Sequence, residues 1–293
     1  RLMADRSWER GLHQLIEAKE DCPLTPRKDT RARISYQRFF RRYLGLAGMT
    51  GTAREVAAEL WSVYHLRVVS VPTARPLRRR ILPDQVHASG AAKWQAVVEA
   101  VTAAHGQGRP VLVGTRSVEA SEHLSRLLDA VRLEHQVLNA RQDANEAQIV
   151  AAAGARGRIT VATNMAGRGT DIRLGEGVPE LGGLHVVATE RHEARRIDRQ
   201  LFGRCGRQGD PGTAQALVAL DDELIRTYMW RPLRWTVRAL LRFPGGVVGR
   251  LCARLLFEKA PRAAERLHGR MRRELLTLDD QISDSLAFSG RPE

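Results

Sequence analysis

Cysteine and lysine are both scarce in this 293-residue chain. The three cysteines, Cys22, Cys205 and Cys252, lie far apart and form no CxxC pair. This favours a reducing compartment and argues against a zinc site. No apolar run approaches the length of a membrane span, and no secretory signal opens the chain, so we expect a cytosolic protein. Because the first residue is Arg1, we interpret the sequence as a piece of a longer protein.

A phosphate-binding loop of the GxxxxGK[ST] type is also missing, since no glycine is followed by lysine. This absence affects how we interpret Asp221-Asp222-Glu223, which follow an apolar run and resemble a magnesium-holding Walker B segment. Without the loop, we interpret these acids as the first turn of a helix, where negative charge is favourable. His13, His185 and His192 lack a ligand spacing such as HExxH, so no metal site is expected.

Net charge is +14, and arginine supplies nearly all of it, because the lysines are limited to Lys19, Lys28, Lys93 and Lys259. Such a surface attracts phosphate-bearing partners, meaning nucleotides, nucleic acid or anionic lipid headgroups. Charge by itself does not choose among these partners. The apolar fraction of 43% is enough for one large or two modest hydrophobic cores.

The first 83 residues predict helices followed by a linker. Residues 1–45 are charged and have a roughly helical apolar spacing, whereas residues 45–53 are small and turn-forming. A helix is expected around residues 57–61, followed by a β-rich run at 68–71. Prolines and arginines alternate from 72 to 83, which predicts an extended basic linker and a domain boundary.

From residue 93 to about 228, helical segments alternate with short apolar strands. Strands are predicted at 111–113, 137–138, 159–162, 184–187 and 216–220, and helices at 94–104, 118–130, 149–153 and 192–201. This alternation predicts an α/β domain with a parallel sheet covered on both faces. Ligands bind such sheets at the carboxyl ends of the strands, and we expect two arginine–glycine loops there.

The residues after 230 predict a basic helical region. Arginines recur at helical spacing from Arg231 to Arg242, and Pro244-Gly245-Gly246 predicts a turn. A second helix with Arg250 and Arg254 would complete a basic hairpin over 230–258, and a further charged helix is expected from about 262 to 278.

The two arginine–glycine segments carry the chemistry. TNMAGRGTD (163–171) holds Arg168, Gly169 and Asp171, and QLFGRCGR (200–207) holds Arg204 and Arg207 three residues apart. A guanidinium suits a polyphosphate, and arginine clamps stabilise the charge on a departing γ-phosphoryl group. We expect Arg168 at nucleotide phosphates and Asp171 at a ribose hydroxyl. The alternatives are a solvated arginine, a capping aspartate, and basic residues that merely end a helix. The occurrence of both segments in one α/β domain favours the nucleotide.

These segments resemble SecA, the ATPase motor of bacterial preprotein translocation. The resemblance extends over residues 1 to about 230 almost without gaps and returns faintly at 273–280. It is carried by GLHQLIEAKE (11–20), LAGMTGTA (46–53), VLVGTRSVEASE (111–122), VLNARQDANEAQIVAAAG (137–154), TNMAGRGTDI (163–172) and GGLHVVATERHEARRIDRQLFGRCGRQGDPG (182–212).

The resemblance implies a RecA-like P-loop NTPase or helicase-type sheet domain with a helical amino-terminal segment and an α-helical carboxyl-terminal extension. Residues 1–71 would hold the end of the preprotein-binding insertion and the carboxyl-terminal part of the first nucleotide-binding domain. Residues 72–229 would form the second, and residues 230–293 the start of the helical scaffold.

The resemblance also implies roles for individual residues. The implied nucleotide contacts are made by Arg168, Gly169, Asp171 and Gln200. Asp171 would contact the ribose, and Gln200 would also help join the two domains. Arg204 and Arg207 would act as arginine fingers with Arg168 at the phosphates. Thr50, Gly51 and Thr52 would couple hydrolysis to domain movement.

The implied partners are the SecYEG channel, unfolded preproteins, an anionic lipid surface and a second copy of the chain, with non-specific RNA binding. The protein would lie in the cytoplasm, peripheral on the inner face of the cell membrane. Mg²⁺ would be held by the first domain.

Several departures from the family affect these expectations. The Walker A lysine and Walker B acids have no counterpart here, so we expect this chain alone not to hydrolyse ATP. Either those parts lie upstream of Arg1, or the protein is a degenerate relative. The segment 230–258 departs from the family pattern.

Two other classes of function remain open. One is a superfamily-2 RNA or DNA helicase domain, which shares the arginine-finger logic. The other is a membrane-surface adaptor that uses the hairpin 230–258, because Trp230, Trp235 and Phe243 beside arginines suit an interfacial helix.

Overall fold

The computed structural model describes residues 7–8, 10–26, 34–138, 146–163, 170–242 and 247–287. The chain divides into two compact units. One comprises residues 1–48, 59–66 and 271–293, and the other comprises residues 49–58 and 67–270. Within the described residues, no helix is both long and apolar enough to cross a membrane.

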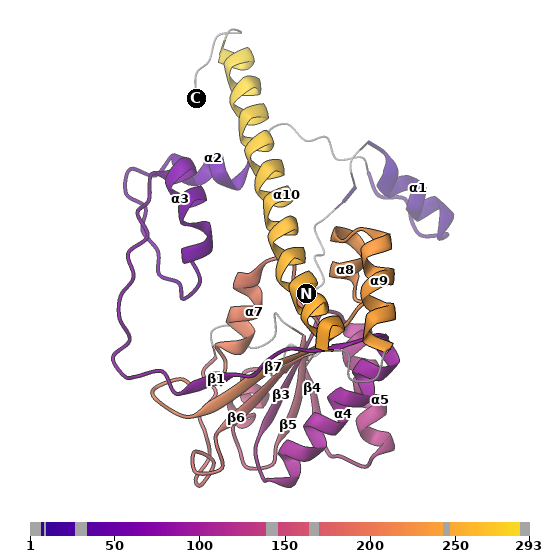
Figure 1. The fold of residues 1–293 in the computed structure, drawn as a ribbon. Coiled ribbons are helices and arrows are strands. Elements are labelled where there is room, and N and C mark those ends of the chain that lie inside the picture. The colour runs from indigo at the N-terminus through magenta and orange to yellow at the C-terminus, as the bar shows by residue number, and fades with distance from the viewer. Residues whose placement is uncertain are drawn as a thin grey trace. The chain divides into compact units, whose positions relative to one another are not determined.

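The larger unit is built on a parallel β-sheet (Figure 1). Its strands are β1 (Arg79–Ile81), β2 (Gln85–His87), β3 (Val111–Thr115), β4 (Gln136–Leu138), β5 (Ile159–Thr163), β6 (Leu184–Ala188) and β7 (Gly212–Ala219). The order across the sheet is β1-β7-β6-β3-β5-β4, and β2 also pairs with β7. All the described pairings are parallel, as the alternating pattern predicts.

Helices cover both faces of this sheet. On one face, α4 (Gly90–Gly106) and α5 (Val118–Ala130) bury Val97, Val101, Leu124 and Leu128 against the strands. Each begins at a serine, Ser89 or Ser117, whose hydroxyl accepts a backbone N–H three residues on.

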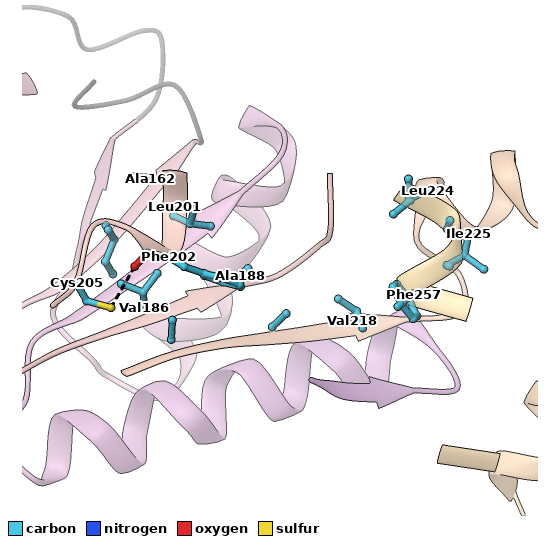
Figure 2. Packing of buried hydrophobic residues seen from close by; sticks show 14 of the residues in the cluster. Ala162, Val186, Ala188, Leu201, Phe202, Cys205, Val218, Leu224, Ile225 and Phe257 are labelled. Carbon is cyan, nitrogen blue, oxygen red and sulfur yellow. Dashed lines mark hydrogen bonds between the residues drawn. The ribbon is translucent and has the colours of Figure 1, made fainter. Parts of the chain in front are cut away.

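The other face carries α6 (Glu146–Ala152), α7 (Arg195–Phe202), α8 (Glu223–Tyr228), α9 (Arg231–Arg242) and the part of α10 (Val247–Ala287) that belongs to this unit, up to Arg270. Figure 2 shows how Leu201 and Phe202 of α7, Leu224 and Ile225 of α8 and Phe257 of α10 join this second core. The predicted α/β architecture with both faces covered is therefore confirmed.

A glycine in the central strand sets how closely α7 approaches the sheet. A Cβ atom at Gly114 of β3 would lie 2.4 Å from Cδ2 of Leu201. Because real Cβ atoms do not come so near, any side chain at this position would push α7 outward. The missing side chain thus fixes the depth at which the helix carrying the second arginine–glycine segment packs.

The smaller unit contains α1 (Leu12–Lys19), α2 (Tyr36–Arg41), most of α3 (Ala57–Tyr64) and the end of α10, whereas the short 3₁₀ turn η1 (Arg54–Val56) belongs to the larger unit. The helix expected near 57–61 is confirmed. The helical spacing expected within residues 1–45 is confirmed at α1, although helix in the described part of that segment is limited to α1 and α2. Pro23 and Pro26 follow α1 and do not favour its continuation.

Three further expectations need correction. The run 68–71 forms no strand, and Val69 and Val71 are exposed without a partner strand. The expected linker 72–83 contains β1, which pairs with the first residues of β7. The second arginine–glycine segment does not reach a carboxyl end of the sheet, because residues 203–211 lead into Gly212, the first residue of β7.

The basic hairpin is confirmed for α9 and the start of α10, which pack closely where a Cβ at Gly249 would lie 2.7 Å from the Leu240 backbone. The expected separate helix at 262–278 is part of α10, which continues through Pro261. Ala260 and Ala264 are fully buried on either side, so packing outweighs the hydrogen bond that proline removes. The predicted turn at 244–246 and Phe243 lie outside the described residues.

Candidate nucleotide-facing site

Helix α7 is held at its start by a carboxylate from α10. The N-cap residue Ala194 offers no side-chain cap, and the backbone N–H of Arg195 donates instead to Oε1 of Glu265 at 2.9 Å. The Arg195 guanidinium also donates to Glu265, with Nη2 to Oε2 at 2.9 Å. Negative charge at a helix amino terminus is favourable, so this pair stabilises the start of α7.

A buried charge network then fixes the first turn of α7. Asp198 is buried, and its Oδ1 accepts from the His192 backbone N–H at 3.1 Å and lies 2.6 Å from the His192 ring Nδ1. Arg191 donates to Oδ2 of Asp198 at 3.3 Å and to both oxygens of Asp84. Burial lowers the pKa of Arg191, but Asp198 and Asp84 together outweigh burial and raise it. The guanidinium also lies over the Phe202 ring, 5.2 Å from its centre.

The segment after α7, residues 203–211, is called the arginine loop here. It is pressed against β1, since a Cβ at Gly206, whose φ is +63°, would lie 2.5 Å from Cβ of Arg79. The Arg79 Nη1 donates to the Cys205 carbonyl at 3.2 Å. Cys205 is buried, and burial raises the pKa of its thiol to about 11, so it stays a protonated packing residue.

The structure brings the arginine loop to the end of the first arginine–glycine segment. Arg207 donates from Nη1 to Asp171 Oδ1 at 2.8 Å and from Nε to the Gly203 carbonyl at 2.9 Å. Arg204 donates from Nη1 to the Thr170 carbonyl at 3.3 Å. The side chains of Arg207 and Asp171 keep 37% and 43% of their surface exposed, so a ligand can reach both. Arg168 and Gly169 lie outside the described residues.

The Thr50–Thr52 segment also meets α7, within the same compact unit. The Gln200 side-chain amide donates to the Thr52 hydroxyl at 3.2 Å, and the preceding residue, Arg199, forms an ion pair with Glu55. Thr52 is buried, and its backbone N–H donates to the Thr50 hydroxyl at 3.2 Å. Gly51 is exposed, and a Cβ atom at this position would meet nothing within 4 Å.

The acidic triplet at 221–223 begins a helix, as expected. Asp222 is the N-cap residue of α8 and Glu223 lies in its first turn. Asp222 is buried, accepts from the Ala219 N–H at 2.8 Å, and pairs with Lys93 Nζ at 2.6 Å. Burial raises the pKa of Asp222 to about 6 despite Lys93.

The histidines occupy structural positions. His185 is buried in β6, where its Nδ1 lies 2.7 Å from the Thr213 hydroxyl and burial lowers its pKa to about 4. His13 lies 3.2 Å from Glu17, one helical turn away. No group of three or more histidine, cysteine or acidic side chains suited to a metal occurs among the described residues.

Sequence reasoning did not identify Asp84, Arg191 and Asp198 as supports of the site. Arg191 and Asp198 lie inside the segment 182–212, so the resemblance to SecA indicated this part of the chain without indicating the two residues. Asp84 is 107 residues away from Arg191 in sequence and gives no local signal.

A doubly covered parallel sheet, with an arginine loop tied to a second glycine-rich segment, defines a class of protein: RecA-like domains of the P-loop NTPase and helicase type. Residues 76–179 and 175–241 match the SecA P-loop domain, and residues 4–61 match the SecA DEAD-like domain. The chain belongs to the SecA family.

Two relatives illustrate the match. The chain is 51% identical over its whole length to protein translocase subunit SecA 2 of Nitrosospira multiformis, of which it covers 44%. It is 48% identical over 97% of its length to protein translocase subunit SecA of Chlorobium limicola, of which it covers 28%. The chain therefore spans less than half the length of these relatives.

Among solved structures, the Escherichia coli DEAD-box protein SrmB is 20% identical with a TM-score of 0.42, covering 50% of this chain and 81% of that one.

Proposed function

We propose that this chain is the second nucleotide-binding half of a SecA-type motor that uses ATP to move preproteins through the Sec pathway. The observation that supports this most directly is the union of the two arginine–glycine segments through the Arg207–Asp171 and Arg204–Thr170 contacts. In this proposal, residues 1–71 end the preprotein-binding insertion and the first nucleotide-binding domain, residues 72–229 form the second nucleotide-binding domain, and residues 230–293 start the helical scaffold.

The proposed nucleotide-binding surface consists of Arg204, Arg207 and Asp171. Arg168 and Gly169, which closely precede Asp171 in sequence, are proposed to belong to it as well. Arg207 already uses Nε and Nη1, and no described residue accepts a hydrogen bond from its Nη2. That end of the guanidinium is available to a phosphate oxygen. Asp171 would accept a hydrogen bond from a ribose hydroxyl, so the residues present fit a ribose and phosphates.

Coupling would pass through α7. The Gln200–Thr52 hydrogen bond and the Arg199–Glu55 ion pair tie the 50–55 segment to the helix that leads into the arginine loop. A displacement of Thr50, Gly51 and Thr52 would therefore pull on the same helix that positions Arg204 and Arg207.

Because the sequence has no GxxxxGK[ST] loop, we propose that this chain alone does not hydrolyse ATP and that Mg²⁺ is held by a first domain outside it. The proposed partners are the SecYEG channel, unfolded preproteins, anionic lipid and a second copy of the chain, at the cytoplasmic face of the membrane. Binding to RNA would be non-specific and salt-dependent.

The test is ATPase activity of the protein extended upstream of Arg1 to its natural start, beside the 293-residue chain. We expect activity in the extended form alone, with a loss of about a thousandfold or more for Arg204→Ala or Arg207→Ala. Arg262→Ala, an exposed arginine on α10, is the matched control and should retain activity.

Full activity of the arginine-loop variants would overturn the proposal. If the upstream sequence contains no phosphate-binding loop, the protein is a degenerate relative that acts as a binding module and not as a motor. Stimulation by RNA, and not by preprotein with membranes, would favour the helicase.

A further inference from the structure

An arginine-lined hollow lies between α8 and α9, near the end of the part of the chain that matches the SecA P-loop domain. It has a volume of about 630 Å³ and is lined by Glu223, Arg226, Thr227, Arg231 and Arg234. Three guanidinium groups thus face one carboxylate. We call this hollow the arginine pocket.

The guanidinium groups of the arginine pocket have few acceptors within the protein. Arg234 donates from Nη1 to the Arg226 carbonyl at 3.1 Å, which holds its head in place, while its Nε is buried without a hydrogen-bond partner among the described residues. Arg226 and Arg231 are exposed, and no described residue forms an ion pair with either. Arg238, further along α9, differs because it pairs with Asp221.

The amino terminus of α9 adds to this positive field. The 12-residue helix begins at Arg231, and the positive end of its dipole attracts anions, although Pro232 has no N–H and the Arg234 N–H donates to the Trp230 carbonyl at 3.2 Å. Planar guanidinium groups bind phosphate oxygens in pairs. The arginine pocket therefore has the chemistry to hold a phosphate group.

Exposed aromatic surface adjoins the arginine pocket. A second hollow of about 650 Å³ shares Arg231 and Arg234 and adds Pro232, Trp235 and Thr236. Trp230 and Trp235 are 75% and 73% exposed, although Val237 of the same helix is buried in the core. The tryptophans are thus displayed outward on an anchored helix.

The start of α10, which packs closely on the carboxyl end of α9 at Gly249, carries an exposed aliphatic stripe. Val247, Val248, Leu251 and Leu255 are all exposed within its first turns. Tryptophan and aliphatic side chains beside arginines are the composition of a surface that lies in a membrane interface.

We propose that the arginine pocket, with Trp230 and Trp235, binds the phosphate headgroups of an anionic membrane. A soluble phosphate compound would use the arginines and leave the tryptophans and the aliphatic stripe in water. Nucleic acid would likewise leave the stripe unused. A lipid surface satisfies the charge and the apolar side chains together. This inference rests on the membrane part of the proposed function, names the surface that meets it, and does not involve Arg204 or Arg207.

The experiment is flotation of the 293-residue chain with vesicles of phosphatidylcholine, or of an equimolar mixture with phosphatidylglycerol. We expect binding to the anionic vesicles, weakened about 25-fold in Arg226→Gln/Arg231→Gln, since each interfacial arginine contributes about fivefold. Arg262→Gln/Arg266→Gln makes the same charge change at two exposed sites of α10 and should weaken binding less than about twofold.

Tryptophan emission supplies a second measurement. Anionic vesicles should shift the emission of the wild type to shorter wavelength, and Trp230→Phe/Trp235→Phe should abolish the shift while the other three tryptophans remain.

Three results would overturn the inference. The first is no binding to anionic vesicles. The second is an equal loss in both double-arginine variants, which would indicate diffuse attraction. The third is binding of inorganic phosphate that depends on Arg226 and Arg231 without any vesicle-induced emission shift, which would indicate a free phosphate ligand. ATPase activity of the extended protein is measured without vesicles, so either proposal can fail alone.

Discussion

Replacing Arg191 by methionine should destabilise the larger unit by about 3 kcal/mol. The change leaves Asp84 and Asp198 without their shared cation, and breaking a buried ion pair costs about 3–5 kcal/mol. The lower end applies here because Asp198 keeps both contacts with His192, and Asp84 is partly exposed and can gain water. Methionine can still cover the Phe202 ring, so lost packing adds little.

The assay is thermal unfolding of the 293-residue chain, followed by circular dichroism. A loss of about 3 kcal/mol corresponds to a midpoint lower by about 6–12 °C for a unit of this size. Arg191→Lys should fall between the wild type and Arg191→Met, since lysine keeps the charge and loses the paired hydrogen bonds. Arg262→Met, at an exposed position, should change stability by less than about 0.5 kcal/mol.

A double-mutant cycle with Asp84→Asn decides whether these groups act as one network. Once Arg191 is gone, removing the charge of Asp84 should cost little or should stabilise, so the double variant should lose less than the sum of the single losses. Coupling of about 0.5–3 kcal/mol is expected for residues in direct contact. Strict additivity, or a loss below about 1 kcal/mol for Arg191→Met, would refute the reasoning.

Three further predictions concern the sheet and its edges. Gly114→Ala should lower stability by about 1–3 kcal/mol in thermal melts, because its Cβ would meet Leu201, and adding Leu201→Ala should recover part of the loss. Burial raises the pKa of Asp222 to about 6, so the stability that its proton supplies is fully present below about pH 4 and lost as pH rises through about 6. Melts across this range should therefore show the wild type losing up to about 3 kcal/mol relative to Asp222→Asn, and a constant difference would contradict this. With a thiol reagent at pH 8, Cys22 should react rapidly while Cys205, whose thiol pKa is about 11, should react after unfolding; equal rates in the folded protein would contradict this.

The sequence predicts the α/β core well because its strands are short runs of buried apolar residues between amphipathic helices. The predicted strand at 111–113 and helix at 118–130 coincide with β3 and α5 to within two residues. Residues 68–71 are rich in β-branched side chains, as β3 is, yet they form no strand, because strand formation depends on a neighbour that local sequence does not specify. The helix expected to begin at about residue 262 is instead a continuation of α10 through Pro261, because burial of Ala260 and Ala264 keeps the helix continuous.

The site was predictable where it is local in sequence. Asp171, Arg204 and Arg207 stand in recognisable segments, and the structure brings these three side chains together. The carboxylate of Glu265 that starts α7 lies 70 residues further along the chain and belongs to no motif. Such a partner follows from the tertiary fold, so residue patterns alone do not reveal it.

The supports of α7 have a consequence for the order of folding. Gln200 meets Thr52 across 148 residues, and Arg195 meets Glu265 across 70 residues in the other direction. Closing such long loops is slow, because their entropy must be lost before the contacts form. During synthesis, the strands can pair as they emerge from the ribosome, whereas α7 gains its last partner only after residue 265 has been made. We therefore expect the arginine loop to reach its final position among the last events of folding.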